Sequence, residues 1–203
     1  MRKVTVLGIT GSIGMGKSTA AEMLREMGIP VHDSDACVHA LLNAGGKAVA
    51  LVGNAFSGVL KADASIDRQA LGRIVFSDPQ KKKQLEEILH PIVKAESDAF
   101  VAQMKKNGHD IIALDIPLLF ETGGENRVDA VICVTAPPEI QRARALARPG
   151  MTPEKFDRIV AGQLPDAEKR KRAGYVVETD KGLDDMHTQL EKIIGQIRGL
   201  QKI

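Results

Sequence analysis

The segment from Gly8 to Thr19 carries the residue types and spacing best suited to chemistry in this chain. Four residues separate two glycines, and a lysine and a serine follow directly, which is the spacing of a nucleotide phosphate-binding loop. Glycines let such a loop bend so that successive backbone N–H groups point at a phosphate. The lysine would meet the β- and γ-phosphates, and the serine hydroxyl would ligate Mg²⁺. We therefore predict triphosphate binding, rather than a plain glycine-rich turn, along Gly11, Ser12, Ile13, Gly14, Met15, Gly16, Lys17, Ser18 and Thr19.

The flanking residues can hold such a loop in place. The apolar run 4–9 before it is typical of a buried strand, and apolar residues at helical spacing follow it. The positive end of that helix dipole would face the phosphates. Residues 31–32 predict a short second strand, and apolar runs at 110–116, 130–135 and 175–178 predict three more. Because these runs are continuous rather than alternating, they indicate a parallel sheet covered on both faces.

Phosphoryl transfer also needs a group that accepts the proton of the acceptor hydroxyl. Such groups gather at the carboxyl ends of strands, where the sequence offers Thr10, Asp33, Asp35 and Asp115. We favour Asp35 as the general base and place Asp33 near the metal or its water shell, although one of the two could instead cap a helix. Asp115 resembles a carboxylate that binds Mg²⁺ through water. Its alternatives are a solvent-facing position or a pair with Lys17.

A polar, basic stretch at 137–172 supplies candidate groups that could close over phosphates. On a helix that begins early in it, Gln141, Arg144 and Arg148 share one face. The two arginines can then point together at phosphates, as in a mobile lid, and an ordinary solvated face is the alternative for either one. The spacing in the run 169–172, KRKR, does not direct its side chains toward one site, and we expect this run to form a solvated face.

Helical patterns dominate between the second and third predicted strands. We expect a short helix over 67–76 with Asp67 as its N-cap, and another that opens at Asp78-Pro79. A third helix is expected to open at Pro91 and to be closed by Gly108. The parallel-sheet pattern is thus interrupted by a helical insertion.

Composition narrows the class of protein. The 203 residues, 43% of them hydrophobic, suffice for one domain core with insertions. The net charge of +2 is uninformative, but only 3% aromatic residues argue against base-stacking surfaces for single-stranded nucleic acid. Cys37 and Cys133 have no metal-like spacing, no apolar run reaches membrane-span length, and the chain enters a strand within four residues. We expect a soluble cytoplasmic protein with neither nucleic acid nor membrane as partner.

Several stretches together resemble the dephospho-coenzyme A kinase family over nearly the whole chain. Besides the glycine loop, they are 31–35 (VHDSD), 67–76, 89–91 (LHP), 115–121 (DIPLLFE) and Gln163 with the basic helix after it. The glycine loop alone is generic, but its combination with LHP and PLLFE at these separations is specific. The resemblance implies a transferase that uses ATP and Mg²⁺ to phosphorylate the ribose 3′-hydroxyl of dephospho-coenzyme A, the final step of coenzyme A biosynthesis.

The resemblance also implies roles for individual residues. Lys17 and Ser18 would serve ATP and Mg²⁺, Asp35 would be the catalytic aspartate, and Arg144 would be the lid arginine at the transferred phosphate. Substrate-binding positions are expected at Thr10, Asp33, Arg68, His90, Pro117 and Leu118, of which Arg68 and His90 match the family's substrate-side helices. Two positions depart from the family pattern, since Arg148 precedes Pro149 rather than Asp, and Thr179 stands where the family tends to have Asn.

The family's three-part build predicts an α/β P-loop NTPase fold of three layers with a central parallel sheet. The nucleotide-binding core would comprise 1–36, 109–136 and 174–203, with a helical dephospho-CoA-binding insertion at 37–108 and a helical lid at 137–173. We expect a monomer or a small homo-oligomer. Two other functions stay open at this point, a kinase of another small acceptor such as a nucleoside monophosphate or shikimate, and a non-enzymatic ATP-dependent switch.

Overall fold

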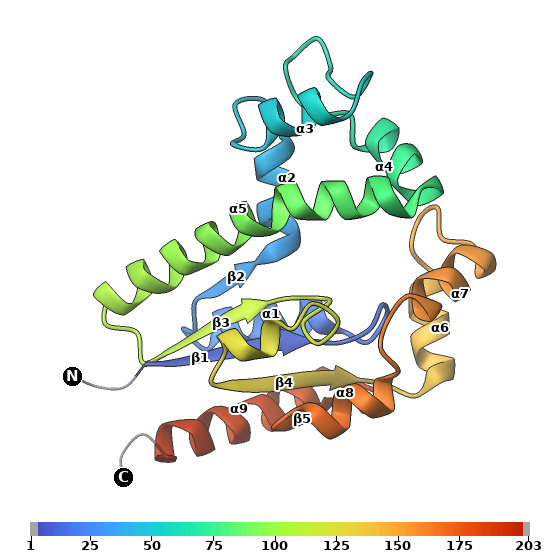
Figure 1. Cartoon of the computed structure of the whole chain (residues 1–203). Helices are drawn as coiled ribbons and strands as arrows, with labels where there is room; N and C mark the ends of the chain where they lie inside the picture. Colours follow the sequence, from blue (N-terminus) through green and yellow to red (C-terminus); the bar gives the residue numbers. More distant parts are fainter. Residues whose placement is uncertain (1–3, 201–203) are drawn as a thin grey trace. The chain divides into compact units, whose positions relative to one another are not determined.

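The computed structural model describes residues 4–200, so the outer limits expected for the core, residues 1 and 203, lie outside the described residues. Contacts divide the chain into two compact units (Figure 1). One unit comprises the described residues up to His32 and those from Gln103 onward, and the other comprises Asp33–Ala102. We call them the sheet unit and the helical unit, and we describe each separately.

A five-stranded parallel sheet is the centre of the sheet unit, in the order β2-β3-β1-β4-β5. The strands are β1 (Thr5–Thr10), β2 (Val31–Asp33), β3 (Ile111–Asp115), β4 (Ala130–Thr135) and β5 (Tyr175–Glu178). Each lies within a residue of an apolar run that predicted it. In the pairing of β1 with β3, Ile9 stands opposite Asp115, so the carboxyl ends of the two strands meet at one edge.

Helices and loops cover both faces of this sheet. The helical segments of the sheet unit are α1 (Lys17–Glu26), η1 (Gly124–Arg127), α6 (Pro138–Leu146), α7 (Pro153–Ala161), α8 (Asp166–Arg172) and α9 (Leu183–Leu200). Leu7 and Ile9 of β1 are fully buried in a cluster with apolar residues of α1 and α9. Gly8, between them, faces the opposite side, where a Cβ would lie 3.0 Å from Leu119. The predicted three-layer α/β fold is confirmed.

The helical unit has a core of its own. Its helices are α2 (Ser34–Leu42), α3 (Val49–Ala55), α4 (Arg68–Ser77) and most of α5 (Pro79–Lys106). Their buried apolar residues, including Val52, Phe56, Leu71 and Leu89, form one cluster. Asp67 caps α4 as predicted, since its Oδ1 accepts hydrogen bonds from the backbone N–H groups of the second and third helical residues, at 2.9 and 3.0 Å.

Pro91 corrects one prediction. It does not open a third helix but lies inside α5, which runs without interruption from Pro79 to Lys106. Proline in a helix interior removes one hydrogen bond and crowds the preceding turn. Leu89 is buried in the core cluster, and Ile88, Ile92 and Val93 pack against it on both sides of the proline. Apolar packing therefore carries the helix through a residue that, read locally, marks a helix start.

The two cysteines are reduced and differ in environment. Cys133 in β4 is fully buried, and burial, aided by the nearby Asp166 carboxylate, raises the pKa of its thiol to about 12. Cys37 in α2 is half-buried, and burial also raises the pKa of its thiol. Within residues 4–200, no helix combines the length and apolar character needed to cross a bilayer.

Candidate active site

The predicted phosphate loop connects β1 to α1, and its shape depends on its glycines. Gly14 and Gly16 have φ angles of +78° and +90°, in the left-handed region that favours glycine. A Cβ on Gly14 would lie 2.5 Å from the backbone oxygen of Gln141, and one on Gly11 would lie 2.6 Å from that of Val134. The N-cap residue of α1 is Gly16, which has no side chain to cap the helix. Its backbone N–H groups and dipole are thus available to an anion, as a phosphate site requires.

Lys17 and Asp115 form an ion pair at the carboxyl edge of the sheet. Lys17 is the first residue of α1 and Asp115 the last of β3. The Asp115 carboxylate is almost fully buried, with 4% of its side chain exposed, and the Lys17 side chain is 15% exposed. A buried carboxylate needs such a partner because desolvation of an unpaired charge is costly. Pairing with Lys17 was one of the two alternatives to metal binding for Asp115.

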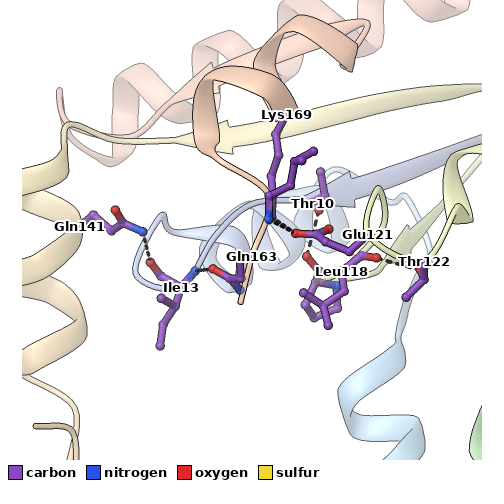
Figure 2. A network of polar contacts seen from close by, with 10 residues as sticks. Thr10, Ile13, Leu118, Glu121, Thr122, Gln141, Gln163 and Lys169 are labelled. Carbon is purple, nitrogen blue, oxygen red and sulfur yellow. Dashed lines mark hydrogen bonds and ion pairs between the residues drawn. The ribbon is translucent and has the colours of Figure 1, made fainter. Parts of the chain in front are cut away.

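Two glutamines bind the backbone of the phosphate loop at Ile13, where Figure 2 shows both side chains. The Gln141 Nε2 donates a hydrogen bond to the Ile13 carbonyl at 2.9 Å. The Gln163 Oε1 accepts one from the Ile13 N–H at 3.2 Å. Gln141 belongs to α6, and Gln163 lies just after α7. The backbone of one loop residue, Ile13, is therefore bound by the chain on either side of α7.

Arg144 reaches the loop through Thr179. Its two terminal nitrogens donate to the Thr179 hydroxyl and carbonyl oxygens, both at 2.7 Å. The same hydroxyl donates to the Met15 carbonyl at 3.0 Å. A Cβ on Gly16 would meet the Thr179 side chain at 3.3 Å. Thr179, which departs from the family pattern, thus fixes the loop and orients the predicted lid arginine.

Arg148 is positioned differently from its predicted geometry. Helix α6 ends at Leu146, so Arg148 lies in the turn beyond it and does not continue the helical face that carries Gln141 and Arg144. The spacing argument that pointed both arginines at one phosphate holds only within a continuous helix. Arg148 is exposed.

The basic run 169–172 is not the uniformly solvated face that we expected. Lys169 is completely buried and forms an ion pair with Glu121 at 2.9 Å (Figure 2). The same Glu121 oxygen accepts a hydrogen bond from the Leu164 N–H at 2.8 Å. Burial opposes ionisation of Glu121, but the Lys169 and Leu164 hydrogen bonds outweigh it and lower the pKa of the carboxyl. Arg172 lies over the Phe120 ring at 4.6 Å.

The segment after β3 contains the predicted substrate positions Pro117 and Leu118. The buried Thr10 hydroxyl donates to the Pro117 carbonyl at 3.2 Å. The Leu118 carbonyl accepts from the Thr122 hydroxyl at 2.8 Å (Figure 2). Thr10 thus fixes the turn after β3 in this structure.

A pocket of about 390 Å³ lies beside the phosphate loop in the sheet unit. Met15 of the loop, the residues after β4 and charged residues of α8 and of the end of β5 line it. Asp166 in its wall accepts a hydrogen bond from Thr135 at 2.7 Å. The pocket therefore adjoins the loop on the side of α6 and α8.

The other predicted site residues lie in the helical unit. Asp33 is the N-cap of α2, and its Oδ1 accepts a hydrogen bond from the Ala36 N–H at 2.9 Å. This is the capping role that we considered for one of the two aspartates. Asp35, in the first turn of α2, is exposed, as are Arg68 at the start of α4 and His90 in α5.

The comparison with protein families decides among the functions left open. A model described as dephospho-CoA kinase matches residues 5–185. The chain belongs to the dephospho-CoA kinase family. This family transfers phosphate from ATP to dephospho-CoA in the last step of coenzyme A biosynthesis. The predictions of a kinase and of this acceptor are confirmed, and the alternatives of another acceptor or of a non-enzymatic switch are set aside.

Relatives of this family cover the chain almost completely. A dephospho-CoA kinase of Mesorhizobium japonicum is 52% identical over 194 residues, which are 96% of this chain and 97% of that protein. A Thermus thermophilus protein, TT1252, has a crystal structure with a TM-score of 0.82 at 36% identity, covering 96% of this chain and 98% of its own. A Campylobacter jejuni dephospho-CoA kinase has a TM-score of 0.70 at 27% identity, covering 95% and 96%. Shikimate kinase from Acinetobacter baumannii shares the fold alone, with a TM-score of 0.51 at 15% identity.

Proposed function

We propose that this chain phosphorylates the ribose 3′-hydroxyl of dephospho-CoA, with the phosphate loop at residues 11–19 holding the ATP triphosphate. The loop geometry carries the proposal. Left-handed glycines leave backbone N–H groups at the uncapped N-terminus of α1, and a buried lysine–carboxylate pair stands beside them. Fixed dipoles and a lysine suit a reaction that proceeds mainly by positioning and charge stabilisation.

We propose that Asp35 is the general base. Its carboxylate is exposed in the first turn of α2, where it can accept a hydroxyl proton from a bound acceptor. Lys17 would neutralise the β- and γ-phosphates, and Arg144 and Arg148 would stabilise charge on the transferred group. Arg68, His90, Pro117 and Leu118 would contact dephospho-CoA. Thr10 and Asp33 would contribute by fixing the turns on which this acceptor side depends, consistent with their hydrogen bonds.

We propose Mg²⁺ as the metal, held by Ser18 and Asp115 together with the triphosphate. Oxygen donors of this kind suit Mg²⁺, which usually keeps several waters and takes only one or two carboxylates from the protein. The residues fit because Asp115 is a buried carboxylate beside the phosphate-binding lysine. When bound, the ion would neutralise charge on the β- and γ-phosphates.

The three segments also receive proposed tasks. Residues 37–108 would bind dephospho-CoA, 137–173 would act as a lid, and the remainder would bind ATP. We further propose a cytoplasmic enzyme that is a monomer or a small homo-oligomer. The few aromatic residues support the absence of a single-stranded nucleic-acid partner.

The Asp35→Asn variant tests the assignment of the base. Loss of general-base catalysis costs about 10²- to 10⁴-fold in rate, so kcat should fall by that factor while ATP affinity stays within a few-fold. Glu86→Gln, which removes a surface carboxylate from α5 of the same unit, should keep kcat. Asp33→Asn keeps an oxygen that can cap α2, so a fall in kcat of this variant would be due to the lost negative charge and not to a lost helix cap. Near-normal turnover of Asp35→Asn would remove Asp35 from the mechanism.

A further inference from the structure

Ile13 stands out within the phosphate loop because side chains bind both its backbone N–H and its carbonyl, which belong to two successive peptide groups. Its carbonyl accepts from Gln141 and its N–H donates to Gln163, at 2.9 and 3.2 Å. The partner atoms fix the orientation of both amides, since a carbonyl needs a donor and an N–H needs an acceptor. The Gln141 side chain is buried, so its hydrogen bond meets little competition from water.

The two glutamines delimit the segment that contains α7. This segment is joined to α6 by Arg142, whose guanidinium pairs with Asp157 at 2.6 Å and lies 5.2 Å from the centre of the Phe156 ring. Helices α6 and α7 are therefore in direct contact, and the chain on both sides of α7 binds the backbone of the same loop residue, Ile13. A loop held in this way cannot change shape without breaking a bond to α6 or to the end of α7.

We propose that Gln141 and Gln163 are positioning residues for ATP, which together fix the two peptide groups that flank Ile13 and thereby pre-form the phosphate-binding shape of the loop. The inference rests on the proposal that this loop binds the triphosphate. Without the two side chains, the N–H and the carbonyl of Ile13 lose their partners, and the loop must reorganise before its N–H groups can converge on phosphate. The cost then falls on ATP binding and not on the acceptor.

The opposite polarity of the two hydrogen bonds gives a test of whether the bonds themselves, and not only the volume of the side chains, are responsible. Glutamate keeps the acceptor that Gln163 supplies but removes the donor that Gln141 supplies. Gln163→Glu should therefore behave closer to the parent than Gln163→Leu, whereas Gln141→Glu should be no better than Gln141→Leu.

The experiment measures steady-state KM for ATP and for dephospho-CoA, with kcat and Tm, for the four variants, for Gln103→Leu and for Lys17→Ala. Unsatisfied backbone groups typically weaken binding by roughly 5- to 100-fold, so KM for ATP should rise by that factor in both leucine variants while KM for dephospho-CoA changes less than about twofold. Gln103, an exposed side chain of α5 bonded to Asn107, serves as the control and should change neither.

The outcomes distinguish a role of the glutamines in positioning ATP from a role in folding, and both from failure of the proposed phosphate loop. Equal KM values for ATP in Gln163→Leu and the parent would overturn the positioning role of the two glutamines, and so would equal losses in Gln163→Glu and Gln163→Leu. A fall in Tm and kcat without a selective rise in KM for ATP would assign the glutamines to folding. If Lys17→Ala keeps the parental KM for ATP, the proposed binding loop fails instead. Amide exchange at Ile13 in the ligand-free protein gives an independent readout, and it should accelerate in Gln163→Leu.

Discussion

The buried pair of Lys169 and Glu121 offers a quantitative test of how the sheet unit is held together. The change is Glu121→Leu, which leaves the ammonium of a completely buried lysine without its partner. Removing one partner of a buried pair typically costs about 3–5 kcal/mol. The Glu121 side chain is 17% exposed, so water can reach the vacated position, and we take the lower end, about 3 kcal/mol. For a chain of this size that corresponds to a fall of about 6–12 °C in Tm.

The two members of the pair should respond unequally. In Lys169→Met a flexible apolar chain fills the buried space, and Glu121 keeps its hydrogen bond from Leu164 and its access to water. We expect a loss of about 1 kcal/mol. The double variant should lie within about 1 kcal/mol of the parent, because apolar replacement of a whole buried pair is often neutral. The coupling between the sites, which is the sum of the two single losses minus the loss in the double variant, would then be about 3–5 kcal/mol.

Urea unfolding followed by circular dichroism measures all three variants, and Glu168→Gln is the control. Glu168 pairs with Lys171 at 2.7 Å in the same helix, but both side chains are largely exposed, so its loss should be within experimental scatter. A cost below about 1 kcal/mol for Glu121→Leu would refute the reasoning. So would additive effects in the double variant, because they would mean that the two charges do not stabilise each other.

Three further predictions concern the loop, α5 and pH. Gly14→Ala should abolish ATP binding detectable by calorimetry, because the new Cβ would collide with the backbone of α6. Gly28→Ala is the control, since Gly28 has a φ of +77° but open space around it, and this variant should lose only about 1 kcal/mol of stability and bind ATP normally. Equal ATP binding by the two variants would contradict the packing argument. Pro91→Ala should raise the free energy of unfolding by about 2 kcal/mol, because the restored helical hydrogen bond outweighs the entropy gained by the unfolded chain. A lower free energy of unfolding in urea would show instead that the proline stabilises the fold. Because folding lowers the pKa of Glu121 from its ordinary value of 4.5, ionised Glu121 stabilises the folded state at pH values above 4.5. This contribution to the free energy of unfolding should be constant near neutral pH and be lost as the pH falls below 4.5. The loss should be smaller in the double variant Glu121→Leu/Lys169→Met, which lacks this carboxyl.

The sheet and the phosphate loop could be predicted from the sequence because their signals are local. Continuous apolar runs predicted the strands, and the glycine spacing selected the loop between β1 and α1. Pro91 misled because the local preference of a proline to start a helix was outweighed by packing of Leu89 and its neighbours. The end of α6 before Arg148 was missed because the pattern of a short exposed helix does not mark where it stops.

Contacts between distant residues explain what the sequence did not predict. The run of four basic residues looked solvated, but the partner of Lys169 is Glu121, which precedes it by nearly fifty residues and which no local pattern connects to it. Gln141 and Gln163 bind backbone atoms 128 and 150 residues away, and a backbone atom leaves no trace in the sequence. Thr179 was noted only as a departure from the family pattern, and its bonds to Met15 and Arg144 appear only in three dimensions.

The unequal surroundings of the two thiols make the molecule convenient for spectroscopy. Cys133 lies in the middle of the sheet with a pKa of about 12, so alkylating reagents will leave it untouched while the protein stays folded. Cys37 belongs to the helical unit and retains access to solvent. A maleimide dye added at mildly alkaline pH should therefore attach at one place without prior mutagenesis. Its emission would then report in real time how the helical unit responds when either substrate is added.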